Sequence, residues 1–194
     1  MAPWLPVTRS SSRPTASTAQ RPASWRCDGA APTGTISPPP AKSRRSPSTP
    51  RFDTNTLVAD VAVITLQTAA LQQGGVQFAR LASQDPAPGT QFTVTGWGAT
   101  GPDTPTLSTT LQAIQEKADT PAGCRSQVGD ALQDGMFCGR PAPGQGTCKG
   151  DSGAPAAADG TVFGMATSRI SPCGNGTDDV YTSTAAYKTW IESQ

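Results

Sequence analysis

The sequence predicts an all-β protein, and three observations support this fold class. Several short apolar stretches are rich in β-branched residues, which is typical of strands. Turn-forming residues, mainly Gly, Pro, Asp and Asn, cluster between these stretches. The chain of 194 residues holds 20 Gly and 19 Pro, a content that suits a fold with many loops. Many short strands with turns between them indicate a barrel or a sandwich.

The strand candidates begin with DVAVITL (60–66), a β-branched apolar run that predicts a buried strand. In QFTVTGW (91–97), Phe92 and Val94 alternate with polar residues, as in a strand with one buried face. The remaining strand candidates are 76–82, 110–118, 136–139, 154–158, 161–167 and 179–184. Residues 184–194 place apolar side chains at helical spacing, which predicts a short C-terminal helix.

Residues 1–51 differ in composition from the rest of the chain. They contain ten of the 19 prolines, and they show no strand or helix period that would bury one face. They carry eight Lys or Arg and one acid, whereas residues 52–194 carry seven Lys or Arg and 13 acids. We therefore expect a disordered, Pro/Ser/Arg-rich tail joined to a domain that begins at residue 52. A basic tail can bind nucleic acid, but the preferred interpretation is a solvated tail without a partner, so no nucleic acid is expected.

The composition excludes several classes of function. No apolar run approaches the ~18 residues of a membrane span, so no membrane partner is expected. The start, MAPWLPV, has no basic region and too short an apolar run for a secretory signal. There is no histidine and no C-x-x-C pair, so we expect no metal site and no cofactor. Four of the five cysteines lie after residue 52, which allows two disulfides and leaves Cys27 over.

The motif GDSG (150–153) raises the question of a nucleophilic serine. With Cys148 before it and Pro155 after it, the motif resembles the nucleophile loop of the chymotrypsin/trypsin-like serine proteases. Further segments resemble this family in the right order: the strand that opens with the catalytic aspartate, the turn into the second barrel, the run into the active site, the last two strands and the C-terminal helix. These segments are 60–66, 94–98, 136–139, 146–153, 162–168 and 179–191. The resemblance covers residues 52–194.

The resemblance implies a chymotrypsin-like double β-barrel with a truncated first barrel, a short C-terminal helix and the disordered N-terminal tail. It also implies two disulfides, Cys124–Cys138 and Cys148–Cys173. The function that it implies is that of a serine endopeptidase, which hydrolyses peptide bonds through an acyl-enzyme. We therefore expect a protein or peptide substrate, a monomer and a secreted, extracellular location.

For the active site, the resemblance implies Ser152 as the nucleophile and Asp60 as the residue that orients a catalytic histidine. The backbone N–H groups of Gly150 and Ser152 would stabilise the oxyanion. Asp60 has an alternative interpretation, as a polar residue at the start of a strand with no catalytic role. In the family, Asp151 pairs with a new N-terminal amine after activation cleavage. No IVGG-like start occurs here, so we expect Asp151 to lack that partner.

The resemblance also outlines a specificity pocket. Its base would be Gly146, six residues before the serine, where trypsin-like enzymes carry an aspartate. Asp179 falls on the adjacent wall and would supply a negative charge instead, which gives a preference for Lys or Arg. A solvated Asp179 is the alternative. Arg169 falls near the lining of the pocket, where it would either pair with Asp179 or block entry.

The family's catalytic histidine is missing, because the chain contains no histidine. Two hypotheses account for this absence. Either residues 1–51 are a wrong-frame reading of GC-rich coding DNA, or the chain is a non-catalytic protease homologue that binds protein ligands through the remnant cleft. Under both hypotheses we expect this polypeptide to have little or no activity, since loss of one triad member costs about 10⁴–10⁶ in turnover.

Overall fold

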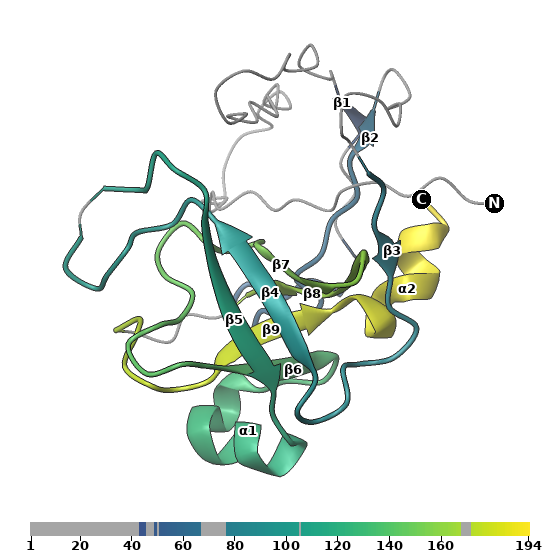
Figure 1. Ribbon diagram of the computed structural model, residues 1–194. Coiled ribbons are helices and arrows are strands. Elements are labelled where there is room, and N and C mark those ends of the chain that lie inside the picture. Colours follow the sequence, from purple (N-terminus) through teal and green to yellow (C-terminus); the bar gives the residue numbers. More distant parts are fainter. Residues whose placement is uncertain (1–42, 46–48, 50, 67–76, 105, 168–171) are drawn as a thin grey trace.

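The main body of the molecule is a closed antiparallel barrel of six strands (Figure 1). The computed structural model describes residues 43–45, 49, 51–66, 77–104, 106–167 and 172–194. In ring order the barrel strands are β4 (Gln91–Gly96), β5 (Gln112–Ala118), β6 (Met136–Pro141), β9 (Asp179–Ser183), β8 (Thr161–Ala166) and β7 (Pro155–Ala158). β7 pairs in turn with β4, with Ala156 opposite Val94, and this pairing closes the ring. The all-β barrel class predicted from the sequence is confirmed.

Outside this barrel, the described residues form three short strands that do not close a second barrel. β1 (Ser43–Arg45) pairs antiparallel with β2 (Thr65–Leu66), and β3 (Arg80–Leu81) runs parallel to β8. Of the described residues in the candidates 60–66 and 76–82, only Thr65–Leu66 and Arg80–Leu81 form strands. In the described part of the chain the first barrel is truncated, as the resemblance implied.

Most of the predicted disordered tail, with Cys27, lies outside the described residues. Two parts of residues 1–51 do make contacts with the domain. β1 is one of them, through its pairing with β2. Thr49 is the other: it is buried, and its hydroxyl donates a hydrogen bond to the carbonyl of Ala59 at 3.0 Å. The domain boundary at residue 52 stays a prediction.

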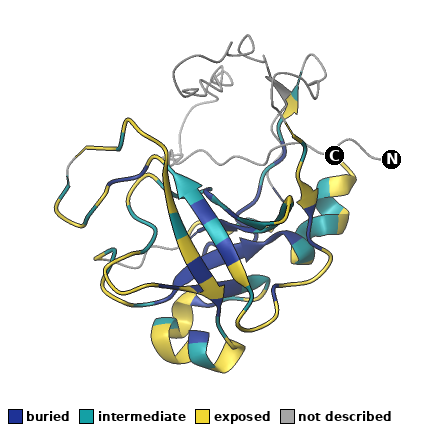
Figure 2. Ribbon diagram, viewed as in Figure 1, coloured by how far each residue is buried: buried dark blue, intermediate teal, exposed yellow. Residues whose placement is uncertain are grey.

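The core of the barrel consists mainly of aromatic side chains and alanines. Phe92 and Val94 of β4 are buried between polar neighbours, which confirms the alternation seen in the sequence. The Phe92 ring packs edge-on against Phe137 and Tyr181, and the latter two rings stack with centroids 5.3 Å apart. Figure 2 shows the buried residues concentrated in the barrel strands, above all in β9, every residue of which is buried.

Two α-helices of the described residues flank the barrel. α2 (Thr184–Glu192) is the predicted C-terminal helix, and the Ser183 hydroxyl caps its first turn. α1 (Pro121–Val128) was not expected from the sequence, because only Cys124 in it is buried and its apolar residues form no clear stripe. The Thr120 side chain caps α1 through the N–H of Gly123 at 2.9 Å. No helix in the described ranges is long and apolar enough to cross a membrane.

Candidate active site

The loop that carries Ser152 lies just before β7 and is anchored on both sides. On one side the Cys148–Cys173 disulfide joins it to the segment that leads into β9. On the other side the N–H of Gly153 donates a hydrogen bond to the carbonyl of Ala166, at the end of β8, at 2.7 Å. Ser152 is partly exposed between these anchors. The loop therefore presents the serine next to the end of β8.

Gly150 is required by the shape of this loop. Its φ of +99° lies in the left-handed region, which residues with a side chain rarely adopt. A Cβ at this position would lie 2.6 Å from Leu107 Cδ2 and 3.2 Å from the Cα of Gly98. A bulkier residue would thus displace the loop from the chain segment that follows β4.

The Asp151 carboxylate is held by backbone groups. Its Oδ1 accepts a hydrogen bond from the N–H of Gly98 at 2.8 Å, and its Oδ2 accepts one from the N–H of Cys148 at 3.0 Å. The first bond ties the nucleophile loop to the end of β4, and the second closes the loop on itself. The carboxylate thus has two backbone N–H groups as donors in this structure.

Asp60 is buried, with 7% of its surface exposed, and is held at the point where three parts of the chain meet. Thr167, directly after β8, donates a hydrogen bond from Oγ1 to Asp60 Oδ2 at 2.8 Å. The preceding residue, Ala59, has a left-handed φ of +57°, and its N–H donates to the hydroxyl of Tyr187 on α2 at 3.1 Å. A strained backbone of this kind persists only where its surroundings hold it. Sequence reasoning did not identify Thr167 or Tyr187 as partners of this segment.

The end of β8 links the two residues assigned to the catalytic machinery. Ala166 binds the residue after Ser152, and its neighbour Thr167 binds Asp60. The structure therefore brings the predicted nucleophile and the predicted orienting aspartate to the same strand end, although they are far apart in the sequence.

Gly146 and Asp179 also come together. Asp179 accepts hydrogen bonds from the N–H of Thr147 at 2.6 Å and from its hydroxyl at 2.8 Å. A Cβ on Gly146 would stand 3.3 Å from Asp179 Oδ2. The alternative of a solvated Asp179 is wrong, because only 6% of its surface is exposed. Burial raises the pKa of Asp179, and the hydrogen bonds from Thr147 act in the opposite direction. Arg169 lies outside the described residues.

A cavity of about 430 Å³ lies beside this loop. It extends from the strand ends of β4 and β5 to the Cys148–Cys173 disulfide, and Gly146, Thr147 and Asp151 line it. The cavity therefore adjoins both the predicted pocket base and the carboxylate that holds the nucleophile loop.

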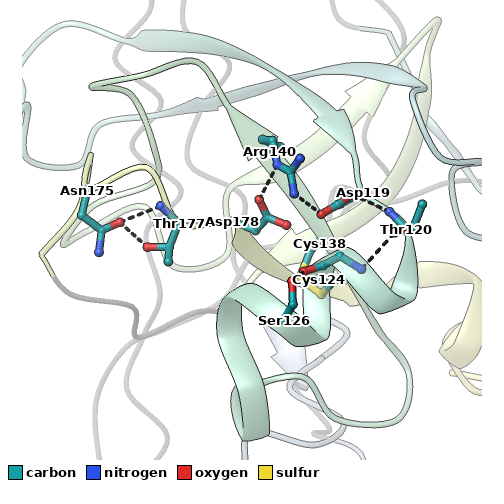
Figure 3. Close-up of polar contacts among 10 residues, drawn as sticks. Asp119, Thr120, Cys124, Ser126, Cys138, Arg140, Asn175, Thr177 and Asp178 are labelled. Carbon is teal, nitrogen blue, oxygen red and sulfur yellow. Dashed lines mark hydrogen bonds and ion pairs between the residues drawn. A yellow bond between two sulfur atoms is a disulfide. The ribbon is translucent and has the colours of Figure 1, made fainter.

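An ion-pair cluster lies on the outer side of the barrel, near the second disulfide, Cys124–Cys138 (Figure 3). Arg140 of β6 donates from Nε to Asp178 at 3.0 Å and forms a second ion pair with Asp119. Burial is the main cause that raises the pKa of Asp178 to about 6, and Arg140 partly opposes it. Asp178 directly precedes β9 and is fully buried, with Arg140 bound to one of its carboxyl oxygens. The described residues contain no group of three or more His, Cys, Asp or Glu that could hold a metal ion.

A closed antiparallel barrel with a Gly-Asp-Ser-Gly loop and a buried aspartate at one strand end defines the trypsin-like class of serine proteases. The family model described as Trypsin matches residues 39–191. The chain therefore belongs to the trypsin family. The match begins before residue 52, where the motifs alone placed the start of the resemblance.

Individual relatives support the same family. Kallikrein-7 of Homo sapiens is 34% identical over 152 residues, which are 77% of this chain and 60% of the relative. Kallikrein-8 of Mus musculus is 31% identical over 134 residues, which are 69% of this chain and 52% of the relative. The solved structure of neuropsin, a serine protease expressed in the limbic system of mouse brain, matches with a TM-score of 0.74 and 28% identity, covering 79% of this chain and 71% of that one. The chain spans about 52% to 60% of the length of these curated relatives.

Proposed function

We propose that this chain is a serine endopeptidase by lineage that hydrolyses peptide bonds very slowly or not at all. One observation carries the proposal. The end of β8 holds both the Ser152 loop and Asp60, yet none of the 194 residues is a histidine. Ser152 and Asp60 can thus take the places of the nucleophile and of the orienting carboxylate. The chain has no histidine to act as the base between them.

The proposed chemistry follows from these groups. In the family, the serine hydroxyl attacks the peptide carbonyl while histidine takes its proton, and a buried aspartate orients that histidine. Ser152 and Asp60 take the first and last of these roles here. The N–H groups of Gly150 and Ser152 stabilise the oxyanion. A serine hydroxyl without a base is a poor nucleophile, and in serine proteases where this was measured the loss of one triad member costs about 10⁴–10⁶ in turnover.

The substrate class in this proposal is a protein or peptide. Asp179, buried against Gly146 and Thr147, places a carboxylate at the predicted pocket base and supports a preference for Lys or Arg side chains. The two disulfides support an extracellular, secreted location. We propose a monomer with no nucleic-acid or membrane partner.

An assay of the full chain against its own Ser152→Ala variant tests the proposal. Peptide substrates with Lys, Arg, Phe, Leu and Ala before the cleaved bond are incubated with both proteins, and a trypsin preparation serves as the positive control. We expect the two proteins to give the same background rate. Turnover that is present in the parent chain and lost in Ser152→Ala would show that the chain finds a base elsewhere.

The second candidate function is a non-catalytic homologue that binds protein ligands through the old cleft. The cavity beside Gly146 and the hydrogen-bonded loop of Ser152 support it, because peptide contact at this cavity does not require a base. It predicts that peptides are bound and released uncleaved, with equal affinity for the parent chain and Ser152→Ala. Absence of measurable peptide affinity in both proteins would rule it out.

A further inference from the structure

A glutamate lies inside the barrel, where a charged side chain is costly. Glu116 of β5 is 1% exposed, and neither of its carboxyl oxygens accepts a hydrogen bond from an N–H or O–H group of the described residues. The hydroxyl of Tyr181 on β9 is also buried and unpartnered in this part of the chain. Buried polar groups normally find partners, so these atoms need an explanation. Neither group belongs to the active site described above.

Strand register shows where the Glu116 carboxyl points. Gly139 of β6 pairs with Ala118 on one side and with Asp179 on the other. A Cβ on Gly139 would overlap Glu116 Oε2, so the glutamate side chain fills the space above this glycine. Its carboxyl is therefore directed across β6 toward β9, where Asp179 stands directly opposite Gly139. The absence of a side chain at Gly139 therefore leaves room for the Glu116 carboxyl to approach Asp179.

We propose that Glu116 and Asp179 share one proton, with the Glu116 carboxyl donating to the Asp179 carboxylate, and that Glu116 thereby helps to determine the preference of the pocket for cationic side chains. Thr147 already donates twice to Asp179, and Glu116 supplies a third donor. Three donors stabilise the ionised form of Asp179, which then holds a single negative charge beneath Gly146. Glu116 is a positioning residue, because it acts through Asp179. The proposal rests on the proposed function in taking Gly146 and Asp179 as the specificity pocket.

The electrostatics of the pair agree with this arrangement. Burial, followed by the nearby Asp179, raises the pKa of Glu116 to about 9, so this carboxyl is neutral at pH 7. Asp178 also raises the pKa of Glu116, whereas the Tyr181 hydroxyl lowers it. The hydrogen bond from Glu116 lowers the pKa of Asp179, against the effects of burial and of Asp151. In the proposed pair, Glu116 holds the one proton and Asp179 the one charge.

Two readouts test the proposal with the full chain. The first is infrared absorption at pH 7, where a protonated carboxyl gives a C=O stretching band distinct from that of carboxylates. We expect this band in the parent chain, its loss in Glu116→Gln, and its shift in Asp179→Asn. The second is the affinity for benzamidine, an aromatic cation, measured by calorimetry beside the neutral benzamide. Lys117→Gln, exposed on the same strand, is the matched control.

The variants have distinct expected affinities at pH 7. We expect benzamidine to bind at least tenfold more tightly than benzamide, and Asp179→Asn to remove this difference. Glu116→Leu has no donor, so it should weaken benzamidine binding several-fold. Glu116→Gln should keep affinity within about twofold, because its amide N–H replaces the shared proton. If Glu116→Leu does not fold, the infrared band and Glu116→Gln decide the question.

The outcomes test the pocket assignment and the role of Glu116 separately. Equal affinity for benzamidine and benzamide in the parent chain would overturn the pocket assignment, and the infrared band alone would then decide whether the proton is shared. A benzamidine site that needs Asp179 but is unchanged in Glu116→Leu would overturn the role of Glu116 in specificity. A parent spectrum at pH 7 without the carboxylic acid band would overturn the shared proton.

Discussion

The Asp151 carboxylate joins two backbone segments that are separated by about fifty residues. It binds the N–H of Gly98 at the end of β4 and the N–H of Cys148 within its own loop. Hydrogen bonds to a charged acceptor are among the stronger ones, at about 1.5–3 kcal/mol each. The position of Ser152 relative to the barrel therefore depends on its immediate neighbour.

We expect Asp151→Asn to lower the free energy of unfolding by about 1.5–3 kcal/mol. An amide offers one acceptor oxygen in place of two and carries no charge, so one of the two backbone N–H groups loses its partner. Urea unfolding measures the change, with Asp103→Asn as the control, since Asp103 is exposed. Equal stabilities of the two variants would show that the carboxylate is not what holds the loop.

We expect Glu116→Gln to stabilise the protein by an amount that grows with pH. The folded-state pKa of about 9 lies above the ordinary value of 4.5, so below pH 4.5 both states are protonated. Between these values the unfolded chain ionises while the folded chain stays neutral, and the parent loses up to about 1.4 kcal/mol per pH unit relative to the variant. Urea unfolding of both proteins at pH 5, 6, 7 and 8 measures this slope. A stability difference that is constant with pH would contradict the raised pKa.

At this scale the sequence predicted the residues that stand in motifs and missed those that act through long-range contacts. Ser152 and Asp60 stand in recognisable segments, whereas Thr167 meets Asp60 across 107 positions. Glu116 did leave a signal in the sequence. Strand alternation places it on the same face as Ile114 and Ala118, both of which are apolar. An acid between two inward-facing apolar residues indicates a buried carboxyl.

At the scale of elements, α2 connects the barrel to the segment that carries Asp60. Thr184 in its first turn donates to the carbonyl of Val162 in β8 at 2.7 Å. Tyr187, one turn later, accepts the N–H of the left-handed residue Ala59 at 3.1 Å. The helix thus holds the backbone directly before Asp60 in a conformation that costs energy on its own.

We expect Tyr187→Phe to lower the free energy of unfolding by about 1 kcal/mol, because the Ala59 N–H loses its acceptor. Glu192→Gln, exposed at the end of the same helix, serves as the control. Chemical unfolding measures both variants. If Tyr187→Phe is as stable as the control, α2 does not support the Asp60 segment through this bond.

The two helices show what sequence patterns predict at this scale. α2 has apolar residues at helical spacing and was predicted. α1 has none of this periodicity, and its position depends on the Cys124–Cys138 disulfide, a contact that no local pattern encodes. The pair Thr120-Pro121 was nevertheless a usable signal, since a capping threonine followed by proline is typical of a helix start.

At the scale of the whole molecule, the Cys148–Cys173 disulfide connects the nucleophile loop to the segment before β9. We expect Cys148→Ser combined with Cys173→Ser to lower the free energy of unfolding by about 3 kcal/mol, because the unfolded chain gains conformational entropy without the cross-link. The double variant should also bind benzamidine more weakly. Cys124→Ser combined with Cys138→Ser is the matched control. It should lose a similar amount of stability and keep its affinity, because that disulfide holds α1 on the outside of the barrel. Loss of affinity in both double variants would point to general loosening of the fold.

The architecture as a whole was predictable to different degrees along the chain. Residues 91–184 place apolar and β-branched residues in clear strand patterns, and six strands form there as a closed ring. Residues 60–66 and 76–82 have similar patterns but form strands of only two residues each. A strand needs a neighbour to pair with along its length, and the described residues offer these segments little to pair with. The apolar pattern of these two segments did not reveal that they lack neighbouring strands.

The closed ring has a consequence for how the backbone exchanges its amide protons with solvent. Every strand from β4 to β9 has a neighbour on both sides, whereas β2 has only β1 among the described strands. Amides of the ring should therefore exchange with deuterium mainly through global unfolding, and those of β2 through local opening at far lower cost. The amides of the six-stranded ring would then exchange slowly, and those of the β1–β2 pair would exchange fast. Asp60, the predicted orienting residue, lies on the segment that leads into β2, whereas the loop of Ser152 is bonded to β8 of the ring.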